Sequence, residues 1–129
     1  MFQPLFHQAI RTGTKRSTIR LKARCKPGDD LSLRAWTGKP YRSKQRLLKE
    51  VQCARVQQIR LEPGQWPLRV FTSPFGGDWQ ELGDPEMMAL AEREGFVRAD
   101  GFPDVEGMRI WFDHQVPRGT PFVGELIEW

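Results

Sequence analysis

A lysine, a threonine hydroxyl and an arginine stand close together near the start of the chain, at Lys15, Thr18 and Arg20. A threonine hydroxyl is inert as a nucleophile until a base removes its proton, and a lysine amine serves as that base once its pKa is lowered. Burial, together with Arg16, Arg20 and Lys22, would lower the pKa of Lys15, whereas the carboxylate of Glu94 would oppose that shift, and the sequence leaves the balance open. Arg20 would hold an anion or stabilise negative charge on an acyl oxygen. The segment therefore predicts an anion-binding site that is equipped for hydrolysis.

Apolar and polar residues alternate in this segment, as they do in a strand with one buried face. Within a strand over residues 16–24, Ile19 and Leu21 would face the core. Thr18 and Arg20 would face the other way, so the strand would present a hydroxyl and cations to a cleft. The alternative is an exposed strand whose basic face is simply solvated.

The carboxylate of Glu94 is the third candidate group. A helix is predicted to begin at Asp84, whose side chain would cap it, with Pro85 in its first turn and Gly95 after its end. Glu94 then lies in the last turn, where the helix dipole disfavours an acid by a few tenths of a kcal/mol, up to about 1. A cation from the strand would offset this cost, and the alternative is an exposed acid at a frayed helix end. We expect Glu94 and the strand to line one cleft.

Other residues of the first half are typical of a binding surface that does no chemistry. Basic side chains would follow phosphate groups, and aromatic side chains would stack on bases at about 1–3 kcal/mol each. For Trp36 the alternative is a place in the core. The predicted ligand-binding residues are Arg16, Arg20, Lys22, Trp36, Lys39, Tyr41, Arg42 and Lys44.

Charge is distributed unevenly along the chain, although the formal net charge is only +4. Residues 1–60 contain 15 Lys and Arg against 3 Asp and Glu, whereas residues 61–129 contain 5 against 13. The split predicts a basic surface that attracts a polyanion. The alternative is that the two halves neutralise each other in surface salt bridges, each of which contributes little to stability.

The 129 residues predict a single domain, 1–129. The apolar runs are too short to cross a membrane, and the first ten residues lack the features of a secretory signal. We therefore expect a cytoplasmic protein whose cysteines, Cys25 and Cys53, are reduced; one disulfide between them is the alternative. Neither these cysteines nor His7 and His114 have the spacing of a zinc site, so no metal and no cofactor are expected.

Short strands and helices are predicted for the rest of the chain. The stretch 47–61 changes phase, which predicts a long bent strand with a bulge; a helix over 43–58 is the alternative. Residues 73–83 show neither period and predict a loop. Further strands are expected at residues 31–36, 68–72 and 122–129. One further helix is expected to begin at Pro4 and to end before Gly13, and another is expected to begin after Asp104, whose side chain would cap it. The sum is an α+β fold, with about five or six strands and about three helices in a small barrel.

Two groups of residues resemble the ASCH family. The first is Gly-x-Lys-x-x-Thr-Ile-Arg at residues 13–20, followed by Lys-Pro-Gly-Asp at 26–29. The second is Gly-Phe at 95–96, Asp-Gly-Phe at 100–102 and the closing segment 122–129. The resemblance covers nearly the whole chain, and it implies a small β-barrel like that of the PUA RNA-binding domain, with flanking helices.

The resemblance implies either RNA binding or hydrolysis. Family members are implicated in RNA-linked roles, and some are hydrolases. One bacterial group is similar to an amidohydrolase that deacetylates N4-acetylcytidine with a lysine, a threonine and a glutamate, which match Lys15, Thr18 and Glu94. This chain is longer than that group. The expected function is an RNA- or nucleotide-binding domain with a basic cleft. The alternative is a hydrolase, either an amidohydrolase on an N4-acylated cytidine-type nucleoside or a ribonuclease on single-stranded RNA.

Overall fold

The computed structural model of the chain describes residues 2–39, 41–64, 67–74 and 77–129. These residues form an α+β fold of three helices and seven strands in antiparallel sheets. The helices are α1 (Pro4–Thr12), α2 (Asp84–Glu94) and α3 (Val105–Asp113). The strands are β1 (Ser17–Arg20), β2 (Asp30–Trp36), β3 (Gln45–Gln52), β4 (Arg55–Glu62), β5 (Arg69–Ser73), β6 (Gln80–Glu81) and β7 (Phe122–Glu128).

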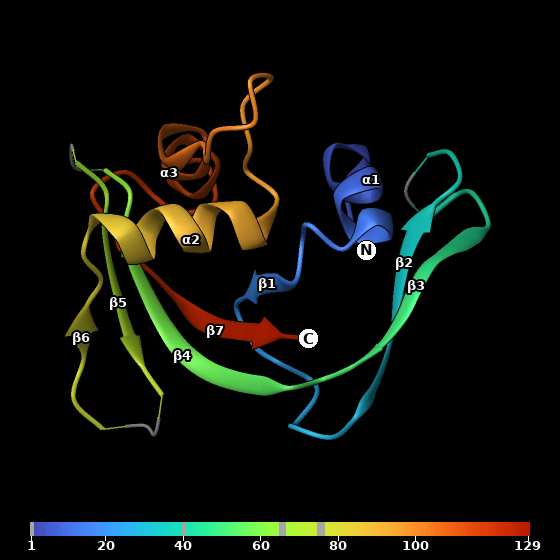
Figure 1. Cartoon of the computed structure of the whole chain (residues 1–129), viewed down its shortest axis with the longest axis horizontal. Coiled ribbons are helices and arrows are strands. Elements are labelled where there is room, and N and C mark those ends of the chain that lie inside the picture. Colours follow the sequence, from blue (N-terminus) through green and yellow to red (C-terminus); the bar gives the residue numbers. More distant parts are fainter. Residues whose placement is uncertain (1, 40, 65–66, 75–76) are drawn as a thin grey trace.

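The strands form two sheets. One has five strands in the order β1-β7-β4-β5-β6, and the other is the hairpin β2–β3. Within the described ranges these sheets are not closed into a barrel, so the α+β class is confirmed and the predicted barrel closure is not observed. We call residues 30–52, which contain the hairpin, the arm. It extends away from the larger sheet as a curved ribbon (Figure 1).

The bent strand predicted over 47–61 is confirmed, and the alternative helix is wrong. Only Cys53 and Ala54 separate β3 from β4, so the two strands are one ribbon that bends as it leaves the sheet (Figure 1). The predicted bulge is also present, because the register between β2 and β3 shifts where Leu48 has no partner on β2.

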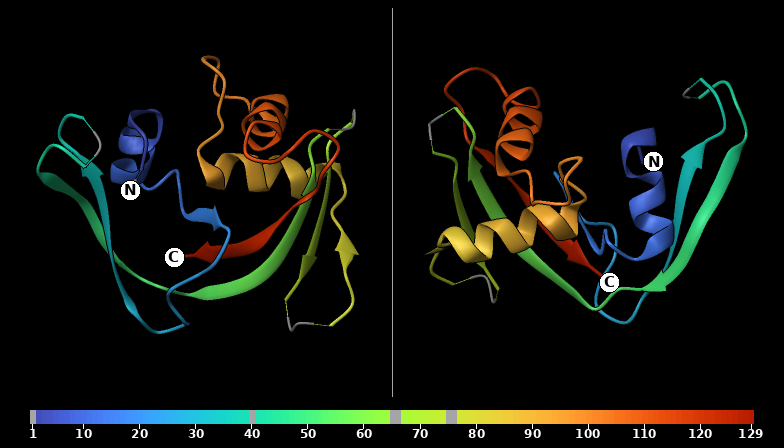
Figure 2. Two further views of the ribbon diagram at one scale, coloured as in Figure 1. Left: turned by 180° about the vertical axis from the view of Figure 1, so that it is seen from behind. Right: turned by 45° about the horizontal axis from the view of Figure 1, so that its top comes forward.

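The helices lie on one side of the curved sheet. Both views in Figure 2 place α2 and α3 over the larger sheet and α1 beside the arm. From α1, Phe6 and Ile10 point into the core, which continues under α2 and α3. The largest fully buried apolar side chains are Ile10, Ile59, Leu61, Leu68, Leu90, Met108 and Leu126.

Helix ends follow the predicted positions with one correction. Gly13 and Gly95 adopt left-handed φ angles of 83° and 90° after α1 and α2, and the Asp104 side chain accepts a hydrogen bond from the Gly107 amide at the start of α3. Asp84, however, does not cap α2. It is the first helical residue, and the extended Gly83 precedes it without a capping side chain.

Two strand predictions also need correction. The first strand ends at Arg20, because its pairing with β7 stops at the Arg20–Glu125 pair and the chain then turns toward the arm. Leu21 is therefore 74% exposed and does not face the core as predicted. Within the predicted loop 73–83, the two exposed residues of β6 pair with β5. So short a strand has no periodicity that a sequence could show.

No helix among the described residues combines the length and apolar content that spanning a bilayer requires.

Candidate functional site

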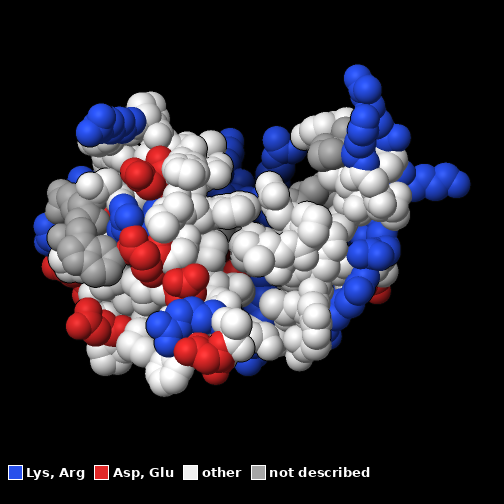
Figure 3. Space-filling view, turned by 90° about the horizontal axis from the view of Figure 1, so that it is seen from above, with Lys and Arg blue, Asp and Glu red and all other residues white. Residues whose placement is uncertain are grey.

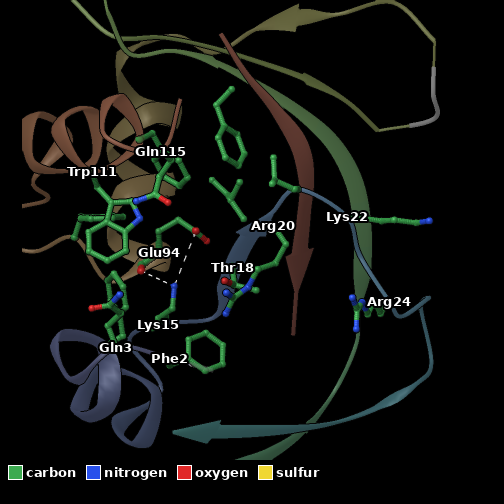
Figure 4. A pocket seen from close by; sticks show the side chains of 16 residues that line it. Phe2, Gln3, Lys15, Thr18, Arg20, Lys22, Arg24, Glu94, Trp111 and Gln115 are labelled. Carbon is green, nitrogen blue, oxygen red and sulfur yellow. Dashed lines mark hydrogen bonds and ion pairs between the residues drawn. The ribbon is translucent and has the colours of Figure 1, made fainter. Parts of the chain in front are cut away.

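A pocket of about 530 Å³ lies between α1, β1 and the α2–α3 region (Figure 4). Its apolar walls are mostly aromatic rings, namely Phe2, Phe6, Phe96, Trp111, Phe112 and Phe122. Its polar and charged lining consists of Gln3, Lys15, Thr18, Arg20, Lys22, Arg24, Glu94 and Gln115. The cationic strand and the acid at the end of α2, which are about 75 residues apart in sequence, thus line the same pocket, as we expected from the sequence.

Lys15 is fixed at the base of this pocket, between α1 and β1. Its ammonium nitrogen Nζ donates to the carbonyl oxygens of Ser17 at 2.7 Å and Glu94 at 2.6 Å. The same nitrogen lies 4.0 Å from Glu94 Oε1 and 4.6 Å from the centre of the Phe6 ring. The lysine is therefore held by backbone groups, a carboxylate and an aromatic face at once.

Burial lowers the pKa of Lys15 from its ordinary value of 10.5 to about 8. Removal from water is the largest cause, the Glu94 carboxylate opposes it, and the Arg20 guanidinium adds to it. Desolvation thus outweighs the attraction of Glu94, a balance that the sequence left open. Lys15 is therefore mostly protonated at neutral pH, but it gives up its proton far more readily than an exposed lysine.

Glu94 is a buried acid, not an exposed one at a frayed helix end. Its Oε2 accepts a hydrogen bond from the Ser17 hydroxyl. Burial is the largest influence on the pKa of Glu94 and raises it, while Lys15, Ser17, Arg20 and Arg93 oppose the rise. Gly95 allows this close approach, since a Cβ there would lie 2.9 Å from Phe6 Cδ1 and 3.3 Å from Lys15 Cδ.

Ser17 is a site residue that the sequence analysis did not single out. It is fully buried and binds Glu94 directly, and Lys15 Nζ donates to its carbonyl oxygen. The alternation of the strand could have identified it, because Ser17 lies on the same buried face of β1 as Ile19. A hydroxyl on a face that is otherwise apolar needs a polar partner.

Thr18 and Arg20 occupy the half-buried face of β1 and line the pocket. The Arg20 guanidinium carbon lies 5.0 Å from the centre of the Phe2 ring. Partial burial is the main cause that lowers the pKa of Arg20, and Glu94 opposes it, yet the group stays charged at any ordinary pH. Lys22 and Arg24 follow β1 at the rim and are exposed.

The other predicted ligand-binding residues do not line this pocket. Arg16 is exposed beside β1. The arm carries Trp36, Lys39, Tyr41, Arg42 and Lys44. Trp36 is half-buried and stands outside the core cluster, with its ring centre 5.2 Å from that of Tyr41. The prediction of one basic cleft is corrected in this respect, because the residues divide between the pocket and the arm.

Most basic residues of the first half are free of acidic partners. Among the described residues, only Lys15, Arg55 and Arg60 of the 15 basic residues in positions 1–60 form ion pairs. In positions 61–129, four of the five do, namely Arg69, Arg93, Arg98 and Arg109. The two halves therefore do not neutralise each other, and basic side chains stand out on the arm side of the molecule and in the hollow that separates α1 and the arm from α2 and α3 (Figure 3).

Within the part of the chain that the structure describes, no group of three or more His, Cys, Asp or Glu side chains could hold a metal ion. Cys25 and Cys53 are free thiols. Comparison of the chain with protein-family models, curated proteins and solved structures gave no match. The case for a function thus comes from the pocket and from the charge around it.

Proposed function

We propose that this protein binds a nucleotide in the pocket, either free or as one unit of an RNA strand. The observation that carries the proposal is the combination, in a single pocket of about 530 Å³, of aromatic walls, a buried Lys15–Glu94 pair and Arg20. Flat bases stack on aromatic rings, and a guanidinium binds phosphate through two parallel hydrogen bonds.

The pocket would divide its contacts between the two ends of a nucleotide. The half-buried rings of Phe2 and Trp111, which line the pocket, would stack on the base. Arg20, with the exposed Lys22 and Arg24 at the rim, would hold the phosphate. The amides of Gln3 and Gln115, together with Lys15 and Glu94, supply donors and acceptors that would orient the base.

Membership of the ASCH family, a PUA-like fold and a cytoplasmic location belong to the same proposal. What supports the family is that three residues of its motif, Lys15, Thr18 and Arg20, share the pocket with Glu94. The charge of residues 1–60, most of which has no acidic partner among the described residues, supports RNA over an uncharged nucleoside.

Calorimetric titration of the protein with the four ribonucleoside monophosphates and the four nucleosides tests the proposal. We expect saturable binding of at least one monophosphate at one per chain, and weaker binding of its nucleoside because Arg20 then has no phosphate to hold. If no monophosphate binds at millimolar concentration, the proposed function is wrong.

A second candidate, amide hydrolysis, is favoured by the geometry around Lys15. A neutral amine has two N–H bonds and one lone pair. The carbonyl oxygens of Ser17 and Glu94 accept both N–H bonds, at 2.7 and 2.6 Å, so the lone pair of the neutral form is left free. A pKa of about 8 keeps a useful fraction of this form at neutral pH.

In such a reaction, the Thr18 oxygen would attack the acyl carbon of an N4-acylated cytidine-type nucleoside while Lys15 takes the hydroxyl proton. Arg20 would stabilise the oxyanion. The carbon–nitrogen bond then breaks, Lys15 returns the proton to the departing amine, and water hydrolyses the acyl-threonine to free the acid.

Incubation with N4-acetylcytidine and, separately, with labelled single-stranded RNA distinguishes the amidohydrolase from the ribonuclease alternative. We expect acetate and cytidine from the first substrate, no turnover in Lys15→Met and Thr18→Val, and unchanged turnover in Arg118→Met, an exposed cation that does not line the pocket. Turnover that survives in Lys15→Met would remove Lys15 from the role of base. Release of RNA fragments would point to the ribonuclease.

A further inference from the structure

We infer that the arm is a second binding surface, which holds a single strand of nucleic acid while a neighbouring nucleotide of that strand occupies the pocket. The inference rests on the proposed function of the pocket and narrows its ligand from a free nucleotide to a strand. The two surfaces adjoin, since the backbone N–H of the pocket residue Phe2 donates to the carbonyl oxygen of Arg34 in the arm at 3.1 Å.

Positive charge that forms no ion pair with the described residues is concentrated in the outer part of the arm. Residues 34–49 contain six basic residues and no Asp or Glu. None of the six forms an ion pair with any described residue, and five of them are exposed. They are Arg34, Lys39, Arg42, Lys44, Arg46 and Lys49. A polyanion that lies along such a surface releases its counterions, which favours binding.

The tip of the arm also presents aromatic surface to solvent. Tyr41 is 89% exposed, and its ring centre lies 5.2 Å from that of Trp36. The backbone of Tyr41 has φ 62°, a left-handed conformation that is strained in a bulky residue. Burial does not compensate for this strain, and strained residues concentrate at functional sites. The ring is held where an unpaired base can stack on it.

Stacking and charge together point to a single strand. A duplex keeps its bases paired inside, so Tyr41 and Trp36 would have no base face to contact. An acidic peptide or an anionic lipid surface would use Lys39, Arg42 and Lys44 but would have no base to stack. The combination of cations and exposed rings is typical of surfaces that follow single strands.

The test measures fluorescence anisotropy of a labelled mixed-sequence strand of about 12 nucleotides, as RNA and as DNA, over a range of salt concentrations. The triple variant Lys39→Gln, Arg42→Gln, Lys44→Gln removes the charge of the tip, and Tyr41→Ala removes the stacking ring. Arg118→Gln, which removes an exposed charge outside the arm, is the control. Mononucleotide binding to every variant is measured by calorimetry.

We expect the triple variant to bind the strand at least about tenfold more weakly. The slope of the logarithm of the binding constant against the logarithm of salt concentration should fall in magnitude by about two, which is near 0.7 for each lost phosphate contact. Tyr41→Ala should weaken strand binding at every salt concentration without changing this slope, and Arg118→Gln should change neither. All variants should bind mononucleotides as the wild type does, because the pocket is intact. A preference for RNA or DNA identifies the kind of strand.

Several results would overturn the inference. If the triple variant binds the strand as tightly as the wild type while mononucleotides still bind the pocket, the arm is not a binding surface and the proposed function stands. If a duplex of the same sequence binds as well as the single strand, or if polyglutamate or anionic vesicles compete as effectively as the strand, single-strand recognition is wrong. If mononucleotides fail to bind the wild type, the pocket proposal fails separately.

Discussion

The ammonium nitrogen of Lys15 lies 4.0 Å from the nearest carboxylate oxygen of Glu94, and each side chain is only 3% exposed. A buried pair of this kind titrates as a unit, because the charge of each group depends on that of the other. While both groups are charged, the attraction of the Glu94 carboxylate opposes the loss of the Lys15 proton, and burial favours that loss. The protonation state of each group decides whether it donates to a polar ligand edge or accepts from it.

Glu94→Gln should lower the pKa of Lys15 below about 8, because the carboxylate is the group that opposes the effect of burial. The amide keeps the shape of the side chain and can still accept from Ser17. Titration of carbon-13-labelled lysine by NMR measures the midpoint directly. Glu92→Gln, an exposed change two residues away on α2, is the control and should leave the midpoint where it is. An unchanged midpoint in Glu94→Gln would contradict the proposed coupling.

The lowered pKa of Lys15 also predicts how stability depends on pH. Between pH values of about 8 and 10.5, the unfolded chain holds a proton on Lys15 that the folded chain has lost. The contribution of Lys15 to the free energy of unfolding therefore rises with pH over this range. Above a pH of about 9, the Cys53 thiol has the opposite effect and lowers stability as pH rises, because burial raises its pKa in the folded chain to about 11. Urea unfolding between pH of about 7.5 and 9 should therefore show the wild type gaining stability relative to Lys15→Met. A difference that is flat or reversed over this range would show that Lys15 keeps an ordinary pKa.

Arg20→Gln should weaken binding of a ribonucleoside monophosphate by about tenfold, the loss of one charge-assisted contact, and leave the nucleoside nearly unaffected. Arg16→Gln removes the same charge from an exposed position that does not line the pocket, so it serves as the matched control. Calorimetry measures both. Equal losses in the two variants would mean that Arg20 acts only through overall charge.

Gly124→Ala should destabilise the fold by more than about 2 kcal/mol, because the added Cβ would overlap the carbonyl oxygen of Arg20 on the neighbouring strand. The same change would shift β1 against β7 and so disturb the pocket. Gly77→Ala, whose Cβ would meet no atom within 4 Å, is the control. Free energies of unfolding in urea compare the two. If both substitutions prove equally mild, β1 is not held closely to β7.

Thiol labelling at a pH of about 8 should modify Cys25 well before Cys53. Cys53 is buried, and burial together with the neighbouring Cys25 raises its pKa to about 11, so little of the reactive thiolate is present. Mass spectrometry after labelling with iodoacetamide locates the modification, and the unfolded protein, in which both thiols should react, is the control. Labelling of Cys53 first would show that its thiol is open to solvent.

The sequence indicated much of the local structure because short-range chemistry decides it. The left-handed glycines at 13 and 95 and the cap at Asp104 follow from backbone conformations that few residues adopt. A cation from β1 near Glu94 could be expected for a related reason, since a positive charge offsets the cost of an acid at a helix C-terminus, but the sequence left an exposed acid as the alternative. These features depend on residues near in sequence or on unlike charges.

What the sequence did not show depends on long-range pairing. The end of β1 at Arg20, and with it the exposure of Leu21, is set by where β7 stops pairing. The direction of the arm depends on the bend at Cys53–Ala54, and a change of phase shows that a bend exists without showing where it leads. The bend is why Trp36 and Tyr41 stand apart from the pocket.

The central claim, that the pocket takes up a nucleotide, is tested most directly by nitrogen-15 NMR during titration with a ribonucleoside monophosphate. The claim predicts that the Trp111 indole and the amides of Lys15–Arg20 shift first and saturate together, while the indoles of Trp36 and Trp79, which do not line the pocket, stay in place. Shifts confined to the arm, or none at millimolar nucleotide, would contradict it.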